Sequence, residues 1–388
     1  MMHTSRMCTK MTSVKPITLV ATIAFTILVF GGWAQETSSG KASTVEFNVP
    51  GAGKAAGQGT FPYSVNPAGL IAGIYADTTG AYHGFLRATD GTFTKFNVAG
   101  AGTGPGQGTG PQEINPAGEI VGWEADSAGV YHGFVRAANG ATTKFDAHGA
   151  GTSAGQGTNG YDINPAGTTA GSYLDSKNVF HGFIRSPKGK ITVFNVTGAG
   201  SGAYEGTFMC NVDCLSPSGT IAGTYADSGN VYHGYLRASN GKITKFNVAG
   251  AGTGSGQGTS SLGLTPNGAV VGAYIDASNV NHGFVRDANG KITKYDIKGA
   301  GKGAGQGTNG FTAGINPAGA ITGEYVDDSG VYHGYVRNGQ GKITTFDAPH
   351  AGTGTGQGTV PYCNNPANAI VGYYSDSAGV YHGFLRTP

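Results

Sequence analysis

The motif Tyr131-His132-Gly133-Phe134-Val135-Arg136 is one of seven copies along the chain. His, Gly, an aromatic residue, an aliphatic residue and Arg keep the same order in every copy. The histidines are spaced by 49, 49, 52, 49, 51 and 49 residues. Self-similarity at such a period is the signature of a repeat architecture. The other six copies begin at Tyr82, Phe180, Tyr232, Asn281, Tyr332 and Tyr381.

Each repeat contains four short strand-like runs that are separated by turn signals. In the second repeat these signals are 115–118 (Asn-Pro-Ala-Gly), 126–129 (Asp-Ser-Ala-Gly) and 139–140 (Asn-Gly). The first pattern is typical of a type I turn and the last of a hairpin turn. No run has the apolar period of a helix. Four strands in each repeat predict either the blades of a β-propeller or the coils of a β-solenoid.

The two ends of the repeat region decide between these architectures. Residues 43–48 (Ser-Thr-Val-Glu-Phe-Asn) match a fourth strand such as 243–247 (Ile-Thr-Lys-Phe-Asn), and the chain stops at Pro388, just after a third strand. A closed ring explains both observations, because the N-terminal strand then completes the last blade and no sheet edge stays exposed. An open solenoid would need capping segments, and none is visible. The sequence therefore predicts that residues 43–388 form an all-β, seven-bladed β-propeller with four-stranded blades of about 49 residues.

Residues 1–34 have the pattern of an export signal. Arg6, Lys10 and Lys15 precede an apolar run at 17–30, and Gly32-Trp33-Ala34 supplies small residues for cleavage. An uncleaved membrane anchor is the alternative, but the apolar run is shorter than the ~20 residues of a spanning helix. We expect cleavage after Ala34, a short linker at 35–42, and a mature protein that is secreted, periplasmic or on the cell surface.

The charge and composition of the remaining chain exclude several classes of protein. Three of the 24 Lys and Arg residues lie in the signal, so 21 remain against 22 Asp and Glu. A near-neutral chain without a basic stripe argues against a nucleic-acid partner. The 71 glycines could indicate disorder, but Val, Ile, Phe and Tyr recur at fixed positions, which favours short strands joined by tight turns.

The repeated motif resembles that of the extracellular HAF-type repeat family of bacteria, which is named for a His-Ala-Phe triplet. The triplet here reads His-Gly-Phe or His-Gly-Tyr, and the resemblance covers residues 60–388. The resemblance implies an exported protein built of repeats, and it implies no catalytic residues.

An Asp lies six residues before each motif His, at a position that faces the His across a hairpin. One interpretation is a set of metal or acid–base sites. The other is structural, with the Asp capping the turn and accepting a hydrogen bond from the His. The presence of seven identical centres favours the structural interpretation, in which no metal or cofactor is bound. For the motif Arg, we expect a contact with the neighbouring repeat. The pairs are Asp77 and His83, Asp126 and His132, Asp175 and His181, Asp227 and His233, Asp276 and His282, Asp327 and His333, and Asp376 and His382.

Glycine-rich connectors join the repeats and contain formal dinucleotide-fingerprint matches. No helix follows them, so we interpret them as connectors whose glycines allow positive φ. Each connector ends with an amide or acid just before the next first strand, and strand alternation places all of these side chains on one face. We hypothesise that this near-ring binds neutral, hydroxyl-rich ligands such as glycans; the alternative is that the side chains tie the connectors to the backbone. The residues are Gln58, Gln107, Gln156, Glu205, Gln257, Gln306 and Gln357.

The fourth repeat departs most from the pattern. It has Tyr204-Glu205 where Gly-Gln is usual, and an insertion that contains Cys210 and Cys214. Export permits disulfides, so we predict a local bridge between these cysteines and an unpaired Cys363, with zinc as the alternative. Glu205 and Asp213 are weak candidates for a catalytic carboxylate pair.

The sequence thus predicts an exported binding or scaffold protein that acts at the cell surface or outside the cell. Its expected partner is a neutral polysaccharide or another envelope protein. We expect a monomer. The alternative is a carbohydrate-active hydrolase or lyase with its site near the fourth blade. A third interpretation is a passive envelope component without a ligand.

Overall fold

The computed structural model describes residues 42–210 and 213–388, which form 28 strands. The predicted signal peptide and the linker up to residue 41 lie outside these residues. Among the described residues, no helix is long and apolar enough to span a membrane.

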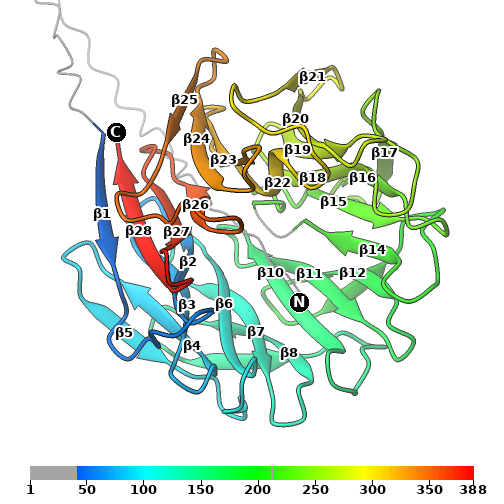
Figure 1. The fold of residues 1–388 in the computed structure, drawn as a ribbon. Coiled ribbons are helices and arrows are strands. Elements are labelled where there is room, and N and C mark those ends of the chain that lie inside the picture. The colour runs from blue at the N-terminus through cyan, green and yellow to red at the C-terminus, as the bar shows by residue number, and fades with distance from the viewer. Residues whose placement is uncertain (1–41, 211–212) are drawn as a thin grey trace, which may run out of the picture.

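The strands follow one another in antiparallel sets of four, one set for each sequence repeat (Figure 1). The first strands are β2 (Gly59–Val65), β6 (Gly108–Ile114), β10 (Gly157–Ile163), β14 (Gly206–Met209), β18 (Gly258–Leu264), β22 (Gly307–Ile315) and β26 (Gly358–Asn364). The second strands are β3 (Ile71–Ala76), β7 (Ile120–Ala125), β11 (Thr169–Leu174), β15 (Ile221–Ala226), β19 (Val270–Ile275), β23 (Ile321–Val326) and β27 (Ile370–Ser375). The third strands, which hold the repeated motif, are β4 (Tyr82–Arg87), β8 (Tyr131–Arg136), β12 (Phe180–Arg185), β16 (Tyr232–Arg237), β20 (Asn281–Arg286), β24 (Tyr332–Arg337) and β28 (Tyr381–Thr387). The fourth strands are β5 (Phe93–Phe96), β9 (Thr142–Phe145), β13 (Ile191–Phe194), β17 (Ile243–Phe246), β21 (Ile292–Tyr295), β25 (Ile343–Phe346) and, for the last repeat, β1 (Ser43–Phe47).

The N-terminal strand β1 closes the sheet. It pairs antiparallel with β28, from Ser43 opposite Thr387 to Phe47 opposite Gly383. The two strands lie side by side in Figure 1, although they come from opposite ends of the repeat region. The prediction of a closed repeating sheet is therefore confirmed.

Successive repeats are also joined at the start of each first strand. The amide of Tyr381 donates to the carbonyl of Gln58 at 2.9 Å, and Gly59 forms a parallel bridge with Tyr381. Gly59 has a φ of +129°, and a Cβ there would lie 1.9 Å from the carbonyl oxygen of Tyr381. Only glycine can occupy this crossing, and the same bridge recurs between the other repeats.

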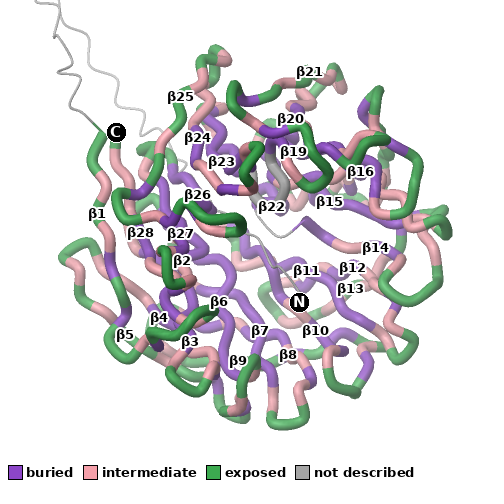
Figure 2. Tube along the Cα trace, in the orientation of Figure 1, coloured by how far each residue is buried: buried purple, intermediate pink, exposed green. Residues whose placement is uncertain are grey.

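The core is concentrated in the inner strands. Figure 2 shows buried residues along the strands near the centre and exposed residues along the outer strands and loops. Each motif contributes one fully buried ring, such as Phe85 or Tyr235. The motif glycine is required because the fourth-strand ring lies over it: a Cβ on Gly84 would lie 2.7 Å from the ring of Phe96.

The motif arginines contact the preceding repeat, as predicted. The guanidinium of Arg87 lies 4.8 Å from the ring centroid of Phe47, the fourth-strand aromatic residue of the last repeat. The same cation–π contact recurs at Arg136 over Phe96 and Arg185 over Phe145, at 4.6 and 4.9 Å. The contact also forms at Arg237, Arg286, Arg337 and Arg386.

Buried asparagines link the repeats at the turn between the first and second strands. Asn66 accepts backbone hydrogen bonds within its own turn and donates to the carbonyl of Asn115 at 3.2 Å. Asn365 donates across the closure to the carbonyl of Asn66, also at 3.2 Å. We call this set the asparagine belt; its other donors are Asn115, Asn164 and Asn316.

Candidate functional site

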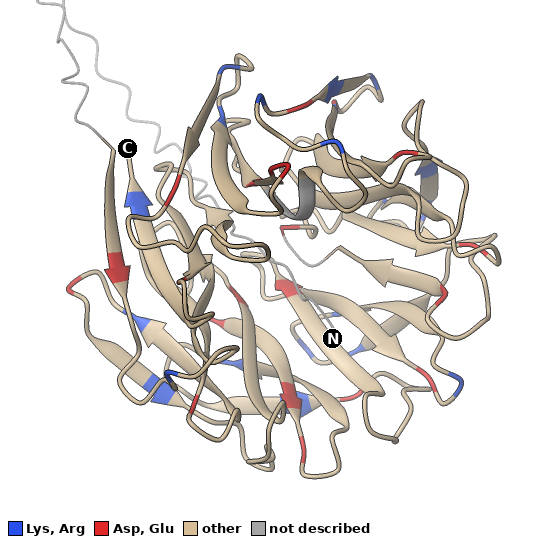
Figure 3. Ribbon diagram, in the orientation of Figure 1, with Lys and Arg blue, Asp and Glu red and all other residues tan. Residues whose placement is uncertain are grey.

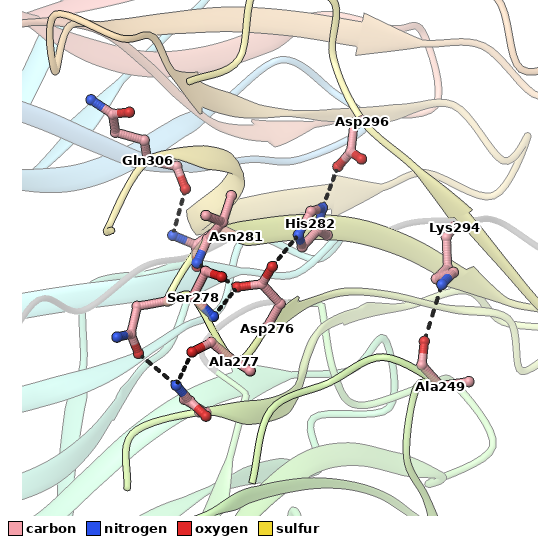
Figure 4. A network of polar contacts seen from close by, with 12 residues as sticks. Ala249, Asp276, Ala277, Ser278, Asn281, His282, Lys294, Asp296 and Gln306 are labelled. Carbon is pink, nitrogen blue, oxygen red and sulfur yellow. Dashed lines mark hydrogen bonds and ion pairs between the residues drawn. The ribbon is translucent and has the colours of Figure 1, made fainter. Parts of the chain in front are cut away.

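The motif histidines join three segments of each repeat. In the fifth repeat, Asp276 accepts the amides of Ser278 and Val280 in the turn, and its other carboxylate oxygen lies 3.4 Å from His282 Nε2 (Figure 4). The Nδ1 of His282 lies 2.9 Å from Asp296 at the end of the fourth strand. These contacts are the ones that the structural interpretation predicts, with the Asp bonded to the turn and the His between the turn and the outer strand, and the structural role itself stays a prediction. Among the described residues, no group of three or more His, Cys, Asp and Glu side chains could hold a metal ion.

The hydrogen bonds of this network shift the pKa of several of its groups. Burial acts to raise the pKa of Asp77, but hydrogen bonds from Thr79, His83 and Ala81 outweigh it and lower the pKa to about 2. In the sixth repeat, the hydrogen bond to Asp347 raises the pKa of His333 against the opposing effect of burial.

Two kinds of histidine partner were missed from the sequence. One is the Asn or Asp that follows the fourth-strand aromatic residue, fourteen positions after the His, such as Asn97 for His83; for His382 it is Asn48, after the N-terminal strand. The recurring Phe-Asn and Phe-Asp pairs were the signal for it. The other is a second-strand tyrosine that stacks on the imidazole in every repeat except the second, as Tyr75 does on His83 at 4.9 Å.

The second repeat has Glu124 at the position of this tyrosine. Its side chain is buried, and Lys144 Nζ lies 2.5 Å from one carboxylate oxygen. Lys95, the counterpart of Lys144 in the first repeat, lies over the ring of Tyr75 instead, at 5.8 Å. Along the ribbon of the described residues, the positions of charged residues are scattered among the strands and loops (Figure 3).

The connector glutamines lie in the loops that lead into the first strands, and their amides bond the loop backbone. Gln107 accepts the amide of Gly104 at 2.9 Å and donates to the carbonyl of Ser127 at 3.0 Å. This arrangement favours a role in fixing the connectors, and ligand binding by these residues stays a prediction. Comparable bonds are made by Gln58, Gln156, Gln257, Gln306 and Gln357.

The cysteines among the described residues occupy two environments. Cys210 and Cys214 form a disulfide with a Cα–Cα distance of 6.0 Å. Cys363 is buried, and its Sγ accepts a hydrogen bond from the amide of Val65 across the closure at 3.2 Å. Ser64 accepts the amide of Ile114 in the same way, so Cys363 takes a place where other repeats use an oxygen acceptor.

The two carboxylates proposed as a catalytic pair differ in exposure. Glu205 lies in a connector and accepts the amide of Gly202 at 2.7 Å. Asp213 is only 1% exposed, so its carboxylate lies away from solvent. Their role as an acid–base pair stays a prediction.

A cavity of about 350 Å³ lies among the third, fourth and fifth repeats. Its rings are Tyr161, Phe180, Tyr204, Phe208 and Tyr232. Its polar groups are Asn159, Thr224, Ser260 and Ser261, and none of the described residues that line it is charged. Its remaining walls are Gly155, Leu174, Met209, Cys210 and Leu262.

Small residues border the cavity between the fourth and fifth repeats, at positions where the closure has aromatic ones. At the closure, Phe61 fills the same place, with its ring 5.4 Å from Tyr373 and 4.7 Å from Tyr381. The strand register puts Ser260 at the position of Phe61 and Thr224 at that of Tyr373. The space left by the missing rings stays open beside Tyr232.

A second cavity, of about 450 Å³, lies beside the connector between the fifth and sixth repeats. Its walls include Asp276, His282, Asp296, Lys298 and Lys302, and none of its lining residues is Phe, Tyr or Trp. The two cavities therefore differ in chemistry, and only the first offers several aromatic faces without a net charge.

Solved structures of other proteins were compared with this chain. The chain is similar to the lectin BP39L from Burkholderia pseudomallei, with 10% identity over 82% of this chain and 95% of that one, and a TM-score of 0.52. The fold is a β-propeller. A puromycin hydrolase matches 84% of the chain and 53% of its own length, with 13% identity and a TM-score of 0.49. A variant of the Aleuria aurantia lectin in complex with alpha-methyl-L-fucoside matches 78% of the chain and 96% of its own length, with 12% identity and a TM-score of 0.44. At these identities the likeness concerns the fold of the propeller alone.

No known protein family and no curated protein matches the sequence. The propeller is therefore assigned to no family, and kinship with the HAF-type repeats stays a proposal.

Proposed function

We propose that the protein is an exported, seven-bladed β-propeller of the HAF type that binds neutral glycans through the cavity among its third, fourth and fifth blades. The blade count is supported by the pairing of the 28 strands in sets of four and by the closure of the last set by β1. Export is supported by the sequence of residues 1–34.

The observation that carries glycan binding is the chemistry of the cavity walls. Sugar rings present apolar C–H faces and neutral hydroxyl edges, so their binding sites combine flat apolar surfaces with hydrogen-bonding groups. Phe208 and Tyr232 supply such surfaces, at ring centroids 6.1 Å apart. Asn159, Ser260 and Ser261 supply neutral donors and acceptors. Pockets for small ligands occupy roughly 300–1,000 Å³, so a cavity of about 350 Å³ suits a single sugar ring rather than a length of chain.

The position of Ser260 gives a direct test. Ser260→Phe introduces the ring that Phe61 supplies at the closure, and it should fill the cavity while the surrounding strands keep their register. We expect the mature wild-type protein to retain neutral glycans on an array and Ser260→Phe to lose that binding. Thermal unfolding of both proteins checks that the variant stays folded.

The double variant Gln107→Ala, Gln257→Ala is the matched control, because it removes two connector amides outside the cavity lining. It should bind as the wild type does. Loss of binding in the double variant, with binding retained in Ser260→Phe, would move the site to the connectors. Absence of any bound neutral glycan with the wild-type protein would overturn the proposed function.

Export is tested separately by the N-terminus of the protein recovered from a bacterial host. We expect it to begin at Gln35 and to lie outside the cytoplasm. A chain that keeps residues 1–34 would contradict the proposed cleavage.

A further inference from the structure

Tyr204 has a backbone conformation that tyrosine rarely adopts. Its φ is +66°, in the left-handed region where a Cβ clashes with the following carbonyl. The corresponding residue of every other connector is a glycine, with φ between +77° and +83°. These glycines are Gly57, Gly106, Gly155, Gly256, Gly305 and Gly356.

The surrounding connector fixes this conformation. The amide of Tyr204 donates to the carbonyl of Asn178 in the preceding repeat at 2.7 Å. Gly106 donates to Gly80 and Gly256 donates to Asn230 in the same way, at 2.9 and 2.8 Å. Because this bond joins neighbouring repeats, Tyr204 cannot relax to negative φ without breaking it.

Packing of the side chain does not offset this strain. The tyrosine is 57% exposed, one of the two large hydrophobic residues with high exposure among the described residues. At Gly106 and Gly256, an added Cβ would meet no atom within 4 Å. A strained residue that contributes little to the core is typical of functional sites.

The ring of Tyr204 lines the proposed glycan cavity. We propose that Tyr204 is the stacking platform of this cavity and selects neutral pyranosides whose terminal ring presents an unsubstituted C–H face. This inference rests on the proposed function and adds the residue that determines which sugars bind. An aromatic face at the cavity wall attracts the weakly positive C–H groups of a sugar, as it attracts the edges of other rings.

The floor of the cavity provides the complementary contacts. Ser261 is 1% exposed, and its hydroxyl has no hydrogen-bond partner among the described residues. Its amide is already bonded to the Thr224 hydroxyl at 3.1 Å, so the Ser261 hydroxyl is the group left for a ligand. A sugar that stacks on Tyr204 can direct a hydroxyl of its opposite edge toward Ser261, which satisfies a buried polar group.

The test compares Tyr204→Gly with Tyr204→Phe and with Gly256→Tyr. Methyl β-galactopyranoside, which has one continuous C–H face, is the probe, and methyl β-galactopyranosiduronate is the charged control. Binding is measured by calorimetry and folding by thermal unfolding. Tyr204→Gly should weaken binding about tenfold, the factor that corresponds to one aromatic contact. It should also raise Tm by about 2 °C, because the strain is removed.

The two other variants separate stacking from backbone effects. Tyr204→Phe keeps the ring and should bind within about twofold of the wild type. Gly256→Tyr places the same strain in another connector and should lower Tm by about 2 °C without a change in binding.

The outcomes distinguish this inference from the proposed function. If the wild type binds the galactoside and Ser260→Phe abolishes binding, but Tyr204→Gly binds as tightly as the wild type, then the stacking role is wrong and the glycan site stands. Equal binding of the uronate and the neutral galactoside would overturn the proposed selectivity. If the wild type binds neither the galactoside nor any neutral glycan on the array, both proposals fall.

Discussion

Replacement of Phe47 by alanine tests whether β1 closes the ring in solution. Phe47 is 8% exposed and lies over Gly383, which has no side chain, so its ring fills the space above the third strand. Its ring centroid lies 6.4 Å from that of Phe85 in the first repeat, and the guanidinium of Arg87 lies 4.8 Å from its centre. The side chain therefore contacts both repeats that meet at the closure.

The expected cost follows from these contacts. Truncation of a buried phenylalanine costs about 3–5 kcal/mol, because it removes apolar burial and leaves a cavity. The loss of the Arg87 contact is included in that range, since the cation–π and packing terms are not additive. We expect Phe47→Ala to lower the free energy of unfolding by about 3–5 kcal/mol.

Phe145 offers a matched control inside the ring. It is 9% exposed, lies over Gly133, and contacts Phe183 at 5.8 Å and Arg185 at 4.9 Å. Because its environment matches that of Phe47, Phe145→Ala should cost the same within about 1 kcal/mol.

Urea unfolding of the chain expressed from residue 35, followed by the fluorescence of Trp123, measures both variants. This tryptophan is the only one among the described residues, and it is buried in the second repeat. A shift of the midpoint without a change of slope reports a change in stability. A cost below about 1 kcal/mol for Phe47→Ala, together with the full cost for Phe145→Ala, would show that β1 does not close the ring.

Three further predictions concern other parts of the propeller. The pKa of Asp77 is lowered to about 2. The contribution of its carboxylate to the free energy of unfolding is therefore fully present above the ordinary pKa of 3.8 and is lost as the pH falls through 2. In urea unfolding, Asp77→Asn should lose part of the decrease in stability that the wild type shows between pH 5 and pH 2. Lys144→Met should lower the stability measured by thermal unfolding by about 3 kcal/mol, because it leaves the buried Glu124 unpaired. Glu124→Tyr introduces the residue that the other repeats have at this position, so the folded protein should tolerate it. Equal losses of stability in the two variants would contradict this account. Reduction of the bridge between Cys210 and Cys214 should cost about 2 kcal/mol, the entropy of a short loop, and a double serine variant that is as stable as the oxidised protein would refute that value.

The closed sheet was predictable because its evidence is local in the sequence. Residues 43–48 carry the alternation and the terminal Phe-Asn of a fourth strand, and the only vacant fourth position belongs to the last repeat. The ends of the other strands were predictable for the same reason, because turn residues next to them mark where each strand stops. Backbone chemistry of this kind can be read from four or five residues at a time.

The partners of the motif arginine and histidine were harder to predict. Arg87 stacks on Phe47, which belongs to another repeat, so the pairing depends on how far one repeat is rotated against the next. His83 contacts Asn97 at the end of the neighbouring strand, and that contact depends on the register of the outer hairpin. A repeated residue type reveals that a contact recurs, but it does not reveal which repeated residue is the partner.

The cavity could not be predicted from the sequence, because the side chains that border it between the fourth and fifth repeats are small and match no motif. Ser260 and Thr224 are unremarkable in the sequence. They become significant only when the structure shows that Phe61 and Tyr373 fill the equivalent places at the closure. The sequence marks Tyr204 as a departure from the repeat, but its positive φ goes with the bond to Asn178, and only the structure shows it.

The fourth and fifth repeats depart from the others on both faces of the ring. On one face they hold Tyr204 and the cavity. On the other face, Ser216 and Thr265 occupy positions of the asparagine belt, and neither side chain has an amide to donate to the next repeat. Each belt hydrogen bond is worth about 1 kcal/mol, so the contact between these two repeats lacks one link that most other contacts have. The contact between the fifth and sixth repeats lacks the same link, because Thr265 would be its donor. Near this turn the fourth and fifth repeats are joined instead by a backbone bond, from the amide of Leu264 to the carbonyl of Asp213 at 2.8 Å, so the cavity lies where a backbone bond takes the place of a belt side chain.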